Sequence, residues 1–178
     1  SPGTGSPRTQ MTVPRPSDDT PAESPASIAA LYEARAREEL RRADRFVAGA
    51  DVVPVAGSLL AQVAVVKGCP GPAEVAGGAA LSGRDGEAVL KALEALGWMR
   101  SDVFFTLSRP VAGADPDAVA RRVRLQIEAV DPELVIALDA QASEDVARAF
   151  GRKAPSPGVV TEMSGRRVLA LDAFEATL

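Results

Sequence analysis

Short apolar runs alternate with amphipathic segments over residues 62–171, and this alternation predicts the fold. Continuous apolar runs, typical of strands covered on both faces, occur at 62–66, 102–107, 134–138 and 167–171. Segments with apolar residues at helical spacing lie between them, at 84–96, 116–130 and 142–150. Strands and helices that alternate in this way form a parallel or mostly parallel sheet with helices on both faces. We therefore predict a three-layer α/β/α sandwich around a central, mostly parallel four-stranded sheet.

The first part of the chain has a different pattern. Residues 1–26 are rich in proline, serine and threonine and contain few bulky apolar side chains, so burial cannot offset the entropy lost on ordering. We predict a disordered tail over 1–26 and a single α/β domain over 27–178. A helix is expected to begin with Ser27 as its N-cap and to end near Phe46.

Composition narrows the possible chemistry. Only 4% of the 178 residues are aromatic although 46% are hydrophobic, so Val, Leu and Ala must build the core. The net charge of −4 gives no overall attraction to nucleic acid, although a local basic patch can still provide one. Histidine, the commonest general base and metal ligand, is absent. The single cysteine, Cys69, excludes an internal disulfide and a cysteine-held zinc or iron–sulfur site within one chain. We expect no metal and no cofactor.

The sequence also bears on location. No apolar run reaches the roughly 18 residues of a membrane helix. The polar, proline-rich start does not resemble a secretory signal. We therefore expect a protein of the reducing cytoplasm that does not engage a membrane.

Five motifs follow one another along residues 40–178. They are V-V-K-G-C-P-G after the first apolar run, A-A-L-S-G-R-D-G-E-A-V-L into a helix, V-F-F-T-L-S-R-P, D-P-E-L-V-I-A-L-D and L-A-L-D-A-F-E-A-T-L. In this order and spacing they resemble the motifs of the uracil-DNA glycosylase superfamily, especially the small branch that often carries an iron–sulfur cluster. The resemblance implies that family's fold for nearly the whole folded part.

The same resemblance places the family's catalytic residues on side chains that lack the chemistry. The water-activating position falls on Gly68, and the position that stacks on uracil falls on Leu81. The asparagine that reads the pyrimidine edge falls on Leu107, which has no side-chain donor or acceptor. The histidine that stabilises the departing anion falls on Asp172, whose charge would repel it. The cluster cysteines are missing, so we expect no iron–sulfur cluster. The family positions that survive are structural: Pro70, Gly71, Gly83, Gly86, Arg109 and Pro110.

The leading hypothesis is a catalytically degenerate glycosylase-like protein that acts as a binding or scaffold module. Its partner is a protein or DNA, in a repair or replication setting that the resemblance implies. The candidates for lining the former pocket are Gly68, Cys69, Pro70, Gly71, Leu81, Gly83, Leu107 and Asp172. The candidates for facing DNA, with the last three expected to point outward from their helix, are Arg84, Arg109, Arg121, Arg122 and Arg124.

Two enzymatic alternatives stay open. One is a divergent DNA glycosylase or other nucleic-acid hydrolase that uses Glu74, Asp85 or Asp172 in a reorganised carboxylate site. The other is a small-molecule enzyme with Cys69 as its nucleophile, although the chain has no histidine to activate a thiol. A perturbed carboxylate that converges with arginines in a closed pocket would favour an enzyme. A filled pocket with an exposed apolar patch elsewhere would favour the scaffold.

Overall fold

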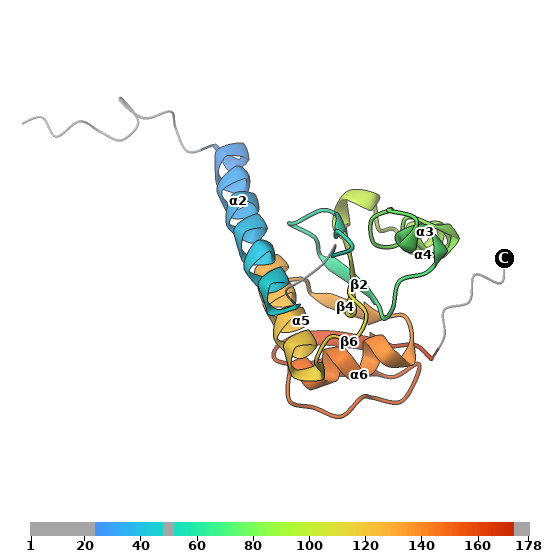
Figure 1. Cartoon of the computed structure of the whole chain (residues 1–178). Helices are drawn as coiled ribbons and strands as arrows, with labels where there is room; N and C mark the ends of the chain where they lie inside the picture. Colours follow the sequence, from blue (N-terminus) through green and yellow to red (C-terminus); the bar gives the residue numbers. More distant parts are fainter. Residues whose placement is uncertain (1–23, 48–51, 173–178) are drawn as a thin grey trace, which may run out of the picture.

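The computed structural model describes residues 24–47 and 52–172 and shows an α/β fold with helices on both sides of a mixed sheet (Figure 1). The strands are β1 (Ala56–Gly57), β2 (Val63–Lys67), β3 (Val103–Leu107), β4 (Leu134–Ala137), β5 (Val160–Met163) and β6 (Arg166–Ala170). The helices are α2 (Pro25–Asp44), α3 (Pro72–Val75), α4 (Arg84–Ala95), α5 (Pro116–Val130) and α6 (Ala140–Ala149). The described residues also form two short 3₁₀ helices, η1 (Arg45–Val47) and η2 (Arg100–Asp102).

Strand β2 lies at the centre of the sheet, whose order is β1-β3-β2-β4-β6-β5. It pairs in parallel with β3 on one side and with β4 on the other, so that Val63 is in register with Val103 and Leu134. Strand β6 continues the parallel set beyond β4. The chain therefore reverses direction across the sheet after β3, and the carboxyl ends of β2, β3 and β4 meet where ligands usually bind in such sheets.

The prediction of four strands is too low, because the described part of the chain forms a sheet of six. Strand β1 lies antiparallel on β3 at one edge, and β5 lies antiparallel on β6 at the other. A two-residue turn joins β5 to β6, and both of its residues, Ser164 and Gly165, have positive φ angles of 50° and 81°. Such a turn matches the twist of a tight hairpin. The S-G pair after T-E-M is the sequence signal for this hairpin.

Each face of the sheet packs on a separate hydrophobic cluster. On one face, Val66 and Phe104 lie in a cluster with Val123 and Ile127 of α5, and residues of α2 and α6 belong to it too. On the other face, Val89 and Leu93 of α4 pack in a cluster with side chains of β2 and β3. The sheet residues of this cluster include Val63, Val65, Val103 and Phe105. Figure 1 shows α2 and α5 on one side of the strands and α3 and α4 on the other. The helical spacing of apolar residues therefore marks the buried faces.

Helix α2 is only partly packed. It begins at Pro25, and Ser24 is its N-cap, because the Ser27 amide donates to Ser24 Oγ over 3.2 Å. The prediction of Ser27 as the cap and of a tail through residue 26 is therefore wrong at its boundary. Residues 1–23 of the predicted tail and residues 173–178 lie outside the described residues. The buried residues of α2 all lie in its second half, and its first half extends beyond the sheet (Figure 1). No helix in the described parts of the chain is long and apolar enough to cross a membrane.

Candidate functional site

The candidate site lies at the carboxyl ends of the four parallel strands. Backbone hydrogen bonds keep these ends aligned beyond the sheet itself: Ser108 N donates to Lys67 O over 2.8 Å, and Leu171 N donates to Ala137 O over 2.8 Å. The residues that follow β2 and β3 are therefore held side by side. The sequence predicts a pocket at this end of the strands, which is called the carboxyl edge of the sheet below.

The first feature of this edge is a buried carboxylate, Asp145 of α6, which is 2% exposed. One of its oxygens accepts from Ser108 Oγ over 2.7 Å and from Arg109 Nε over 3.0 Å. The other accepts from Arg109 Nη2 over 3.1 Å and from Gln141 Nε2 over 3.2 Å. Because the hydrogen bonds to Asp145 stabilise the guanidinium, the pKa of Arg109 is raised above its usual value. Asp145 is thus a saturated acceptor, and Arg109 is held by it.

The second feature is the Lys67 cluster, which consists of Lys67, Glu74 and Asp85. Lys67 ends β2, and its Nζ lies 2.9 Å from Glu74 Oε1 and 2.5 Å from Asp85 Oδ2. Glu74, on α3, is 3% exposed and also accepts from the Leu81 amide. Burial alone would lower the pKa of Lys67, but the hydrogen bonds to Asp85 and Glu74 outweigh it and raise that pKa. The two carboxylates predicted as acid–base candidates therefore neutralise a lysine.

The space in front of Gly68 is occupied. The Gly68 amide donates to Asp139 Oδ2 over 3.1 Å, while Asp139 Oδ1 caps α6 by accepting from the Ala142 amide over 2.8 Å. A Cβ added to Gly68 would lie 2.8 Å from Asp139 Oδ1 and 2.9 Å from Gln141 Cβ. No side chain that activates water fits at this position without displacing the start of α6.

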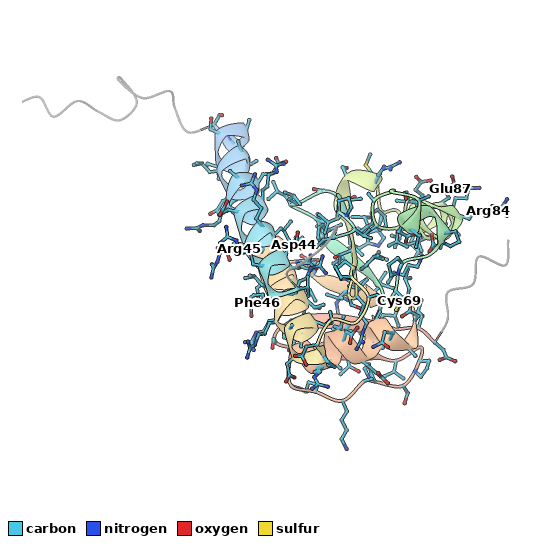
Figure 2. All side chains as sticks on the ribbon, viewed as in Figure 1. Asp44, Arg45, Phe46, Cys69, Arg84 and Glu87 are labelled. Carbon is cyan, nitrogen blue, oxygen red and sulfur yellow. The ribbon has the colours of Figure 1, made fainter. Side chains whose placement is uncertain are left out.

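The other positions on which the resemblance places catalytic residues also lack suitable side chains. Leu81 and Leu107 are 6% and 1% exposed and belong to the hydrophobic cluster on the α4 face of the sheet. Leu81 has a positive φ of 58°, and a Cβ on Gly86 would overlap its carbonyl oxygen, so the loop before α4 is tightly fitted. Asp172 is exposed, and so is Cys69 in the loop after β2 (Figure 2). The pocket positions are thus either filled or open to solvent.

One of the remaining loop candidates, Gly83, borders a separate hollow. A cavity of about 440 Å³ is bordered by residues from β2, α3 and the start of α4. Its lining is Lys67, Pro72, Ala73, Glu74, Gly83, Arg84 and Asp85. Of the predicted pocket residues only Gly83 is among them; Pro70 and Gly71 lie in the preceding loop, and a Cβ on Gly71 would come within 2.9 Å of Lys67 Nζ.

The five arginines predicted to face DNA do not gather into one surface. The prediction that Arg122 points outward is wrong: its side chain is fully buried under β3, where Nε donates to Asp44 Oδ1 over 2.9 Å and Nη1 to the Leu107 carbonyl over 2.7 Å. Burial lowers the pKa of Arg122. Arg124 is outward but bonded to Glu128 over 2.9 Å. Arg121 is exposed on α5, whereas Arg84 is exposed on α4, across the sheet (Figure 2).

Sequence reasoning missed Lys67 and Asp145, which organise this edge. Each has a local signal. Lys67 is a charged residue at the end of an otherwise apolar strand, and Asp145 lies on the buried side of α6 beside Ala142 and Val146. A charge on a face that must be buried requires a partner.

No protein-family model matches the chain, and no curated protein matches it in sequence. Membership of the uracil-DNA glycosylase superfamily therefore stays a prediction.

Proposed function

We propose that this chain is a catalytically degenerate member of the uracil-DNA glycosylase superfamily, which acts in the cytoplasm as a binding module for another protein. On this proposal the four central parallel strands correspond to the family's sheet, and β1 and β5 are additions at its edges. The observation that carries it is the self-contained charge pairing at the carboxyl ends of the strands. There, Asp145 is bonded to Ser108 and Arg109, and separately Lys67 is paired with Glu74 and Asp85.

Base excision requires a pocket that stacks on the flipped base and forms hydrogen bonds with its edge. At the corresponding positions the chain has two buried leucines, Leu81 and Leu107, and a glycine whose front is blocked by Asp139. A general base also needs a free lone pair directed at the attacking water. Both oxygens of the buried Asp145 already accept hydrogen bonds. These features support binding rather than catalysis.

A protein partner is favoured over DNA for two reasons. Arg109, Arg122 and Arg124 are each engaged by a carboxylate of this chain, so they do not offer free charge to phosphates. In addition, the projecting half of α2 exposes large apolar side chains, among them Leu31 at 67% and Tyr32 at 58% exposure. Exposed apolar patches of this kind usually mark contact sites for proteins.

A hydrolase that uses the Lys67 cluster is the second candidate, because the cavity of about 440 Å³ brings Glu74 and Asp85 to a common wall. It is the weaker candidate, because both carboxylates are already engaged in ion pairs with Lys67.

The test is an assay of base release from uracil-containing single- and double-stranded DNA, together with DNA binding across a salt series. We expect no uracil release and no salt-sensitive binding. Release of uracil would overturn the proposal. The control is Glu87, an exposed carboxylate in the first turn of α4, where Asp85 also lies (Figure 2). If release were lost in Glu74→Gln but kept in Glu87→Gln, the Lys67 cluster would be the active site. Salt-sensitive binding without release would replace the protein partner with DNA.

A further inference from the structure

The cavity of about 440 Å³ at the carboxyl edge of the sheet contains charged groups that the chain itself satisfies only in part. Its lining carries two cations, Lys67 and Arg84, and two carboxylates, Glu74 and Asp85. Because these charges balance, the cavity offers no net attraction to a simple anion or a simple cation. Its volume lies in the range of small-molecule sites. The groups that remain open therefore decide which ligand fits.

The acceptor that remains open is one oxygen of Glu74. Its Oε1 accepts from Lys67 Nζ over 2.9 Å and from the Leu81 amide over 3.4 Å, whereas Oε2 accepts from no described residue. The Glu74 side chain lines the cavity although only 1% of it is exposed, so the accessible part of this carboxylate faces the cavity. A buried carboxylate oxygen without a donor is unfavourable. A ligand that brings a positively charged donor would remove this cost.

Donors also remain open around the same cavity. An ammonium has three donors, and Lys67 Nζ uses two of them on Glu74 and Asp85. Helix α4 begins at Arg84, and its N-cap, Gly83, has no side chain that could accept from the first turn. The amides of Arg84 and Asp85 donate to no described residue, and the Arg84 side chain is exposed (Figure 2). The start of a helix with free amides favours a negatively charged group.

The open acceptor and the open donors lie close together, because Lys67 Nζ contacts both Glu74 and Asp85. Glu74 is buried and Arg84 is exposed, so a ligand would enter with its positive end first and keep its negative end at the surface. Pro72 and Ala73 add an apolar part to the lining.

We propose that this cavity binds a small zwitterion of the α-amino-acid class with a short apolar side chain. The ammonium of the ligand donates to Glu74 Oε2, and its carboxylate accepts from the start of α4 and from Arg84. A ligand with both charges on one carbon matches the short separation of these groups. This inference goes beyond the proposed function, which does not depend on it.

The probe is L-valine, compared with two molecules that each lack one of its charges. Isobutylamine is valine without the carboxylate, and isovalerate is valine without the ammonium. In a titration of the full ¹⁵N-labelled chain, we expect valine to shift the amide resonances of Arg84 and Asp85 with a Kd of about 1 mM or lower. Each of the other two molecules should bind at least roughly tenfold more weakly, because each leaves one charged hydrogen bond unmade.

Two variants test the assigned contacts. Glu74→Gln removes the charge that receives the ammonium and should weaken valine binding by roughly tenfold or more. Arg84→Ala should weaken it by about threefold, since an exposed charge contributes less. The matched control is Arg100→Ala, an exposed arginine of η2 that does not line the cavity and should leave binding unchanged.

The assignment would be overturned if valine showed no saturable binding, or if isobutylamine or isovalerate bound as tightly as valine. Equal effects of Arg84→Ala and Arg100→Ala would also overturn it. Circular dichroism checks the fold of Glu74→Gln, and if that variant is unfolded, the three probe molecules and the Arg84→Ala variant still decide. Failure of valine to bind while uracil release is absent removes the cavity assignment alone. Uracil release would instead remove the proposed function.

Discussion

The ion pair between Arg122 and Asp44 offers the sharpest stability test, because one partner is buried and the other is not. The Arg122 side chain is fully buried, whereas that of Asp44, at the end of α2, is 44% exposed (Figure 2). Asp44→Asn removes the charge that lies 2.9 Å from Nε and leaves the guanidinium with the Leu107 carbonyl as its described acceptor. The Nη2 atom already has no partner among the described residues. The substitution therefore leaves the buried Arg122 guanidinium without its carboxylate partner.

The size of the effect follows from these exposures. Breaking a fully buried pair by removing one partner destabilises a protein by about 3–5 kcal/mol. Because Asp44 is partly exposed and therefore screened, we expect a loss of about 2–3 kcal/mol in the free energy of unfolding. Urea denaturation followed by circular dichroism measures this loss from the midpoint and slope.

Arg122→Met provides the decisive background, since it replaces the cation with an apolar side chain. There, Asp44→Asn should be close to neutral or slightly stabilising, because a carboxylate near a helix C-terminus is disfavoured by the helix dipole. The double-mutant cycle should therefore give a coupling of about 2–3 kcal/mol. The control is Asp117→Asn, which breaks the exposed contact with Arg148 at 2.8 Å and should shift the midpoint little. Equal losses from Asp44→Asn in both backgrounds would refute the reasoning.

Two further predictions concern the edge that holds the candidate site. Gly86→Ala in α4 should destabilise the chain by about 2 kcal/mol or more in a thermal melt, because its Cβ would overlap the Leu81 carbonyl; a gain in stability, usual for this change in a helix, would show that the loop yields. The pKa of Lys67 is raised above 10.5, so the stabilisation from its contacts with Glu74 and Asp85 should be complete below pH 10.5 and lost as pH rises through the folded-state pKa. In the Lys67→Arg variant the side chain stays charged in this pH range, so the urea midpoint of the variant should fall less than that of the unmodified chain. An equal fall in both proteins would show that another group titrates.

The order of elements could be predicted because burial on both faces leaves a plain hydrophobic signal. The residues of β2 from Val63 to Val66 are all buried, and the predicted run at 62–66 differs from this strand by one residue at each end. Strand β5 has no such signal, because three of its four residues are at least partly exposed. Strand β1 is only two residues long and follows Pro54. Such short outer strands form because they pair with a neighbouring strand, and their own sequences carry no hydrophobic pattern that would predict them.

The position of the candidate site could also be predicted, but its internal pairing could not. Topology alone places the carboxyl ends of the strands together. The partners of Arg122 and Asp145, however, come from elements 78 and 37 residues away. An arginine on a predicted helix is normally assigned to solvent, and the burial of Arg122 depends on a carboxylate that only the tertiary structure brings near. Long-range charge pairs therefore mark the limit of inference from this sequence.

The same pairing also ties helix α2 to the sheet. Arg122 of α5 contacts the Leu107 carbonyl at the carboxyl end of β3 and Asp44 at the end of α2, so one buried side chain joins three elements. Its position is fixed by two hydrogen bonds to acceptors on different elements. The end of β3 and the packing of α2 on α5 are thus parts of one arrangement, which is the physical reason why a change at Asp44 on the surface should be felt in the core.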